Sequence, residues 1–244
     1  MNKFHYIIAK HDDDVYDKYI KKSMRGKRPI VVNDSPELNS MTKKYNEGIK
    51  RIKNLKANDY VIFVHEDVYI SDDLFEGKIQ MIFGMHQDVG VLGIYGTTQY
   101  IGGGWWSHER PTYAVGNIMQ MTKDGKIHNM RENLPPGMLR KDMVVVDGCM
   151  MIVRGSVINK HKIKFDESIT GFHQYDNSFC LEVLLKTPYK VAVSDFDILH
   201  VSEGAVTDEW MTQSLSLINR YKELGLTIPL TSEKIKEVNY GKVQ

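Results

Sequence analysis

Short polar motifs follow the apolar, strand-like runs of this sequence, and the clearest of them is His65-Glu66-Asp67. It comes directly after the apolar run Tyr60–Val64. In open α/β sheets ligands bind outside the carboxyl ends of the strands, so this motif predicts a ligand for a metal or a phosphate. A turn that caps the next helix is the alternative interpretation, and it suffices for an isolated acidic tripeptide.

A second motif, Asp147-Gly148-Cys149, interrupts the apolar run Met143–Val153. An unpaired carboxylate inside a sheet is costly, so Asp147 is expected to have a partner, a metal or a ligand. A bulge at Gly148 that turns toward solvent is the alternative interpretation.

Two further motifs lie later in the sequence. Asp176 precedes a helical pattern and is predicted in the first turn of a helix. The helix dipole stabilises a carboxylate there without any functional role, but the same position suits a general base at the rim of a pocket. His200 ends a short apolar run, where a lone histidine is more often a hydrogen-bonded or surface residue than a metal ligand.

Strands and helices alternate in the pattern that must position these motifs. Apolar, β-rich runs lie at residues 4–9, 30–32, 60–64, 89–95, 144–153, 190–193 and 198–201. The helical patterns between them predict an α/β fold with a mostly parallel sheet that helices cover. Ser40 and Ser71 are placed to cap two of these helices, and a last amphipathic helix is predicted over residues 208–224.

The middle of the chain, residues 96–142, is different because it lacks sustained periodicity and carries Gly102-Gly103-Gly104 and Pro135-Pro136-Gly137. Long irregular segments in a compact domain are usually functional or mobile. One domain with a loop-rich insertion is the simplest organisation.

Charge and composition exclude several classes of protein. The 244 residues include 32 Lys and Arg against 31 Asp and Glu, and this balance of +1 disfavours nucleic acid as the main partner. The near-neutral sum combines two parts of opposite net charge. Residues 1–60 hold 14 basic and 8 acidic side chains (+6), and residues 61–244 hold 18 basic and 23 acidic side chains (−5). Two cysteines, no signal peptide and no transmembrane run of ~20 apolar residues predict a cytoplasmic protein with free thiols.

The motifs, taken in order, resemble the family 2 nucleotide-sugar glycosyltransferases of GT-A fold, most closely the bacterial branch with His-x-Asp in place of Asp-x-Asp. The resemblance covers about residues 4–202. It implies a Rossmann-like, mostly parallel central sheet with helices on both faces and a loop-rich acceptor region. Residues 1–95 would form the nucleotide-binding half, residues 96–202 the acceptor and catalytic half, and residues 203–244 a C-terminal helical segment.

The resemblance also implies a role for each motif. Asp67 matches a ligand of the divalent metal, Mn²⁺ or Mg²⁺, and His200 matches a histidine that completes the coordination; imidazole favours Mn²⁺. Asp176 matches the catalytic base. His65 would lie near the ribose of the nucleotide. The remaining implied contacts are Asn33, Asp34, Tyr45 and Asn46 for the nucleotide, and Asp147, Gly148 and Tyr175 for the sugar or acceptor.

The implied reaction is the transfer of one sugar from a nucleoside diphosphate sugar, with UDP as the default, to an acceptor hydroxyl by a single, inverting displacement. The acceptor would be a saccharide, glycolipid or glycoprotein. Peripheral contact of the protein with a membrane is compatible with this prediction. Two interpretations of Trp105 and Trp106 are open. Their aromatic faces form a platform for the acceptor sugar, or they belong to a loop that covers the core. A metal-dependent hydrolase or phosphotransferase and a non-catalytic sugar-binding module are the alternatives.

Overall fold

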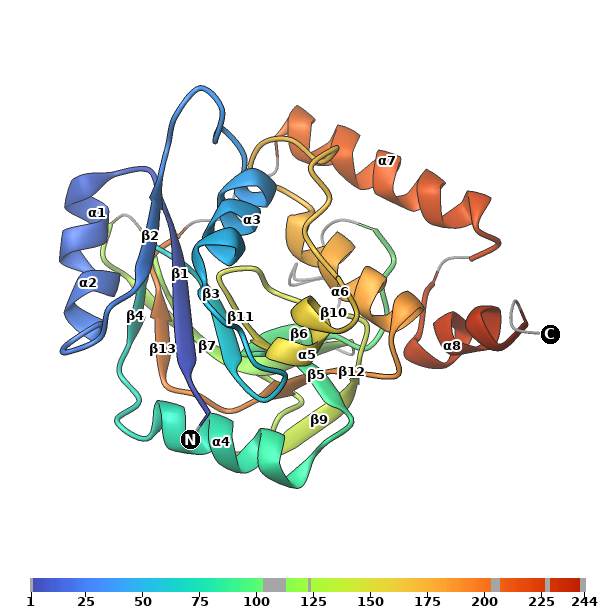
Figure 1. Ribbon diagram of the computed structural model, residues 1–244, viewed down its shortest axis with the longest axis horizontal. Helices are drawn as coiled ribbons and strands as arrows, with labels where there is room; N and C mark the ends of the chain where they lie inside the picture. Colours follow the sequence, from blue (N-terminus) through green and yellow to red (C-terminus); the bar gives the residue numbers. More distant parts are fainter. Residues whose placement is uncertain (1, 103–112, 123, 203–206, 227–228, 242–244) are drawn as a thin grey trace.

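A seven-stranded sheet forms the centre of the computed structural model, which describes residues 2–102, 113–122, 124–202, 207–226 and 229–241 (Figure 1). Its strand order is β2-β1-β3-β11-β5-β12-β9. The strands are β1 (Phe4–Lys10), β2 (Ile30–Asn33), β3 (Tyr60–His65), β5 (Val89–Gly93), β9 (Leu139–Met143), β11 (Met150–Arg154) and β12 (Lys190–Ser194). All run in one direction except β11 and β9, which are antiparallel to their neighbours. The predicted α/β fold with a mostly parallel sheet is confirmed.

A second sheet has the order β10-β6-β7-β13-β4, with β8 paired to β7, and three of its strands directly follow the carboxyl ends of β3, β5 and β12 along the chain. Its strands are β4 (Val68–Ile70), β6 (Tyr95–Thr97), β7 (Ala114–Met121), β8 (Ile127–Glu132), β10 (Val145–Val146) and β13 (Ile198–His200). β13 runs antiparallel to β4, with His200 opposite Val68. This pairing brings the end of β13 beside the residues that follow β3.

The predicted strand over residues 144–153 is divided between the two sheets. β10 belongs to the second sheet and β11 to the first, and Asp147-Gly148-Cys149 is the turn between them. In this turn the Asp147 N–H donates to the Tyr95 carbonyl, and the Asp147 carboxylate accepts from the Cys149 N–H, both at 2.8 Å. Asp147 therefore lies between strands and not inside one.

Helices cover both faces of the central sheet, because neighbouring side chains of a strand point to opposite faces. Phe63 of β3 packs on Tyr45 of α3 (Met41–Arg51) and Phe179 of α6 (Tyr175–Lys186). Tyr60, also in β3, packs on Phe83 of α4 (Phe75–Met85) on the other face. The prediction that helices cover both faces of the central sheet is confirmed.

One predicted helix cap is confirmed and the other is wrong. The side chain of Ser40 accepts a hydrogen bond from the Lys43 N–H at the start of α3. Ser71 does not cap α4, because its hydroxyl donates to the carbonyl of Asp197. The carboxylate of Asp72 accepts the Leu74 N–H instead.

The remaining helices are α1 (Asp13–Lys18), α2 (Ile20–Ser23), α5 (Gly155–Asn159), α7 (Asp208–Glu223) and α8 (Ser232–Gly241). α7 matches the amphipathic helix predicted near the C-terminus, and α8 lies within the segment 203–244 that was expected to be helical, although its bounds were not predicted. In Figure 1, α7 and α8 lie beyond α6 on the side away from β1 and β2. Among the described residues, no helix combines the length and apolar character needed to span a membrane. Cys149 and Cys180 are buried and free, as predicted.

Candidate active site

Three side chains of types that can bind a metal ion meet where β3 ends and β13 ends. His65, Asp67 and His200 each offer a ligand atom, and these atoms lie within 4.8 Å of one another. Asp67 Oδ1 is 3.5 Å from His200 Nε2 and 3.8 Å from His65 Nδ1. The Val201 N–H donates to the Asp67 carbonyl at 3.0 Å, which ties the two strand ends together.

The donor atoms of this cluster are suited to a divalent cation. Asp67 Oδ1 and His200 Nε2 are buried without a hydrogen-bond partner, although unsatisfied buried polar atoms are costly and uncommon. Burial raises the pKa of Asp67, but the neighbouring imidazoles of His200 and His65 outweigh it and lower the pKa below its usual value. An ionised carboxylate with an imidazole is a donor set that fits Mn²⁺ and, less well, Mg²⁺.

A second carboxyl group, Asp176, lies in the first turn of α6 as predicted. Its Oδ2 accepts the Gly148 N–H at 2.9 Å, and its Oδ1 accepts the Asn177 N–H at 2.7 Å. Burial, with the negative charge of Asp147, raises the pKa of Asp176 to about 7, against the opposing effect of these two backbone bonds. A carboxyl group with a pKa near neutrality is suited to general base catalysis.

Tyr175 connects Asp176, its neighbour in α6, with His65 of the cluster. Its buried hydroxyl is hydrogen-bonded to His65 Nε2, and its ring packs 6.1 Å from the His65 ring. Gly148 lies so close that a Cβ there would be 2.1 Å from the Tyr175 hydroxyl oxygen. The end of β3, the turn after β10 and the start of α6 therefore form one packed unit.

Gly148→Ala is expected to lower the free energy of unfolding by about 1–3 kcal/mol, the usual cost of overpacking a rigid interior. It should also disrupt the hydrogen bond between Tyr175 and His65, because the added methyl group displaces the hydroxyl. Gly84→Ala in α4 is the matched control, since nothing lies within 4 Å of its added Cβ. There alanine should stabilise by about 0.5–1 kcal/mol. Urea unfolding of both variants checks this, and equal stability of the two contradicts it.

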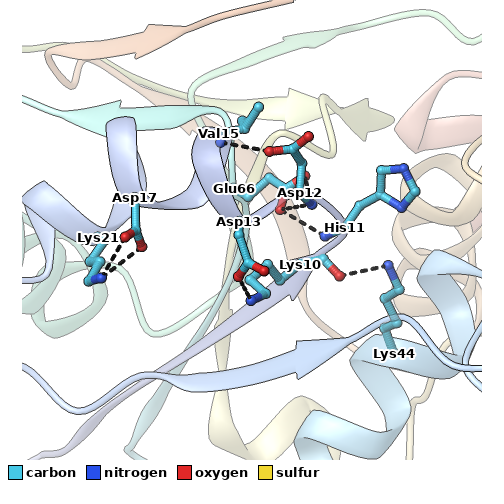
Figure 2. Close-up of polar contacts among 9 residues, drawn as sticks. All are labelled: Lys10, His11, Asp12, Asp13, Val15, Asp17, Lys21, Lys44 and Glu66. Atoms are coloured by element: carbon cyan, nitrogen blue, oxygen red, sulfur yellow. Dashed lines mark hydrogen bonds and ion pairs between the residues drawn. The ribbon is translucent and has the colours of Figure 1, made fainter.

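The loop between β1 and α1, which borders the end of β3, is held by charged side chains from two sides (Figure 2). Glu66 accepts the backbone N–H groups of His11 at 2.8 Å and Asp12 at 3.1 Å. From the other side Lys44 Nζ donates to the Lys10 carbonyl at 3.2 Å. Lys44 is fully buried, and sequence analysis missed it because a lysine in a helix is usually expected to face solvent.

Asn33 and Asp34 end β2 next to this loop, as predicted, and both are exposed. The carboxylate of Asp34 forms an ion pair with Lys44 and a hydrogen bond with the ring of His11. Burial opposes ionisation, but these two partners lower the pKa of Asp34, so it is an ionised acceptor near neutrality. Both residues are therefore accessible to a ligand at the carboxyl edge of the sheet.

Tyr45 and Asn46, which were expected to contact the nucleotide, are both buried in the core. Tyr45 has no exposed surface and packs among the rings of Phe63, Phe165 and Tyr175. Asn46 is buried and exchanges hydrogen bonds with the backbone of Phe165. Both side chains support the site from the core.

Trp105 and Trp106, the predicted acceptor platform, lie outside the described residues.

The two sheets and their covering helices form a GT-A fold, and solved structures share this fold. TarS from S. aureus matches with a TM-score of 0.52 and 13% identity over 95% of this chain and 41% of TarS. GalNAc-T7 matches with a TM-score of 0.57 and 8% identity over 91% of this chain and 50% of GalNAc-T7. The chain thus spans half or less of the length of these two proteins.

The family model described as "Glycosyltransferase like family" matches residues 7–223, which is most of the chain. The protein therefore belongs to this glycosyltransferase-like family, and the predicted family is confirmed. No curated protein sequence matches the chain.

Proposed function

We propose that the protein transfers one sugar from a nucleoside diphosphate sugar, with UDP as the nucleotide, to a hydroxyl group of a saccharide, glycolipid or glycoprotein. The observation that carries this proposal is the convergence, at one edge of the sheet, of the cluster His65, Asp67 and His200 with the carboxyl group of Asp176. A diphosphate leaving group needs compensation of its charge, and an attacking hydroxyl group needs a base.

Asp176 is the proposed base. With a pKa of about 7 it is largely ionised just above neutrality and basic enough to accept the hydroxyl proton. The acceptor oxygen bonds to the anomeric carbon as the bond from this carbon to the diphosphate breaks on the opposite face. A single displacement of this kind inverts the anomeric configuration. Asp147, Gly148 and Tyr175 are proposed to line the sugar and acceptor side.

Asp67 and His200 are proposed to hold Mn²⁺, or alternatively Mg²⁺, and His65 to lie on the ribose side. When bound, the cation offsets the negative charge that develops on the leaving diphosphate. Asn33, Asp34 and the segment Lys10–Asp14 after β1 are proposed to bind the nucleoside. We propose that residues 1–95 bind the nucleotide, that residues 96–202 bind the acceptor and carry out catalysis, and that residues 203–244 are a C-terminal helical segment.

Two related structures support the choice of ligands. A TarS fragment of residues 1–349, with a TM-score of 0.52 and 14% identity over 97% of this chain and 69% of the fragment, was solved with UDP. GalNAc-T7 was solved with UDP, GalNAc and Mn²⁺. At these identities the likeness establishes the fold alone, so the ligand assignment depends on the residues of this chain.

Thermal unfolding with UDP, GDP, CDP and ADP, each with Mn²⁺ or EDTA, tests the proposed function. UDP with Mn²⁺ at 100 times its Kd should stabilise the fold by about 2.7 kcal/mol, a rise in Tm of roughly 5–10 °C for a chain of this size. EDTA should remove most of this shift. No response to any nucleotide would contradict the proposal. A response to Mn²⁺ alone would favour a metal-dependent hydrolase, and one to free sugars alone a sugar-binding module.

A further inference from the structure

Gln174, the residue before the helix that carries Asp176, has an unusual backbone. Its φ of 60° and ψ of −1° lie in the left-handed region, which residues with a side chain rarely adopt. Its side chain does not cap α6, yet only 4% of the residue is exposed. Strained backbone of this kind persists only where surrounding contacts hold it, and it is concentrated at functional sites.

The buried amide of Gln174 joins three separate segments. Its Oε1 accepts from Asn177 Nδ2 in α6 at 2.8 Å and from the Tyr100 hydroxyl group at 3.3 Å. Its Nε2 donates to Ser214 Oγ in α7 at 2.8 Å, and Ser214 in turn donates to the Trp210 carbonyl at 2.8 Å. The four side chains that share these bonds are all buried, so their network is costly to break.

The two residues after Gln174 both point into the site. The hydroxyl group of Tyr175 is bonded to His65, and the carboxyl group of Asp176 accepts the Gly148 N–H. Since the chain is continuous, the backbone direction at Gln174 sets how α6 begins and therefore where these two side chains lie.

We propose that Gln174 is a positioning residue for the transfer reaction. Its left-handed backbone directs Tyr175 and Asp176 toward the sheet edge, and its amide network couples that direction to α7 and to the segment after β6. The inference rests on the proposed function, because it names a residue that sets the placement of the proposed base without touching substrate.

Gln174→Gly and Gln174→Asn test this role. Glycine accepts the positive φ but lacks the amide, whereas asparagine keeps an amide on a shorter side chain that does not span the same distance to Ser214. The measurement is UDP release from UDP-glucose, UDP-galactose and UDP-N-acetylglucosamine with Mn²⁺, to water and to saccharide acceptors. We expect kcat to fall about 10- to 100-fold in both variants, as for other small misplacements of reacting groups.

UDP affinity, measured by calorimetry with Mn²⁺, should stay within about twofold of wild type, because removal of a positioning effect on the base lowers kcat and leaves ground-state binding unchanged. Ser214→Ala removes one bond of the network and should give a smaller loss of kcat. Lys162→Gly is the matched control, since Lys162 also has a positive φ, of 58°, but is exposed and outside the network. It should retain wild-type kcat.

Wild-type kcat in Gln174→Gly would overturn the inference alone. A parallel loss of UDP affinity and thermal stability in every Gln174 variant and in Ser214→Ala would also overturn it, because that pattern marks a purely structural role. Absence of UDP binding by the wild-type protein would instead contradict the proposed function, and this inference with it.

Discussion

Asp176→Asn is expected to lower kcat for sugar transfer by about 10²- to 10⁴-fold, the usual contribution of a general base. UDP affinity with Mn²⁺ should be unchanged, because Asp176 bonds Gly148 and Asn177 and is separate from the cluster of His65, Asp67 and His200. Transfer assays and calorimetry on the same preparation measure the two quantities. Below pH 7 the wild-type rate should fall as Asp176 binds its proton.

The control for this substitution is Asp124→Asn, which makes the same chemical change at an exposed carboxylate in the turn after β7. It should transfer sugar at the wild-type rate. Turnover in Asp176→Asn within about threefold of wild type, against the expected loss of 10²-fold or more, would exclude Asp176 from the role of base.

Asp176 should also reduce stability at high pH. Because folding raises its pKa from 3.8 to about 7, the unfolded chain loses this proton first, and the folded state loses stability as the pH rises through that window. Asp176→Asn should therefore match wild type near pH 4 and exceed it at pH 8 by about 1–2 kcal/mol, less than the full shift implies because the side chain is partly exposed. Urea unfolding at the two pH values measures the difference. A variant that is less stable than wild type at pH 8 would contradict the account.

The second large effect is expected for the proposed metal site, the cluster of His65, Asp67 and His200. Asp67→Asn should weaken UDP binding in Mn²⁺ by about 100-fold or more, since changes to outer partners of a metal site alone cost 10- to 100-fold in metal affinity. The reason is that Asp67 supplies the carboxylate of the cluster and one of its two buried, unpartnered donor atoms. His200→Ala removes the other atom and should reduce binding in the same direction.

Calorimetric titration of UDP in Mn²⁺ and in EDTA tests whether the cluster of His65, Asp67 and His200 holds the cation. In EDTA, wild type and Asp67→Asn should bind UDP equally weakly, whereas in Mn²⁺ only wild type should bind tightly. Asp124→Asn again serves as the matched control and should behave as wild type in both buffers. If Asp67→Asn retained the full response to Mn²⁺, the cation site would have to lie elsewhere.

Much of the fold and part of the site were predictable because their signals are local. The apolar runs predicted the main strands, and Ser40, placed to cap a helix, marked the start of α3. Asp176 could be placed in the first turn of a helix from the pattern that follows it. Asp67 could be placed at a strand end, because a polar motif breaks a buried apolar run there.

Other features were not predictable because a sequence pattern does not indicate what a helix face contacts. Tyr45 was expected to contact the nucleotide, and only the tertiary structure shows that its ring packs against Phe63 and Phe165. The motif Asp147-Gly148-Cys149 marks an interruption of the run over residues 144–153, but the residues on both sides of it are apolar, so the sequence does not show that the chain passes there from one sheet to the other. Lysine is usually exposed, and Lys44 is buried because its ammonium group has partners in the Lys10 carbonyl and the Asp34 carboxylate.

By itself the sequence determined the class of fold, the family and the identity of the groups able to do chemistry, because those depend on residue type and short spacing. Only the tertiary structure decided which groups meet. His200 reaches Asp67 because β13 pairs with β4, and Tyr175 reaches His65 because Gly148 leaves room for its ring. The physical reason is that strand pairing and close packing join segments far apart in the chain, and no local pattern encodes those contacts.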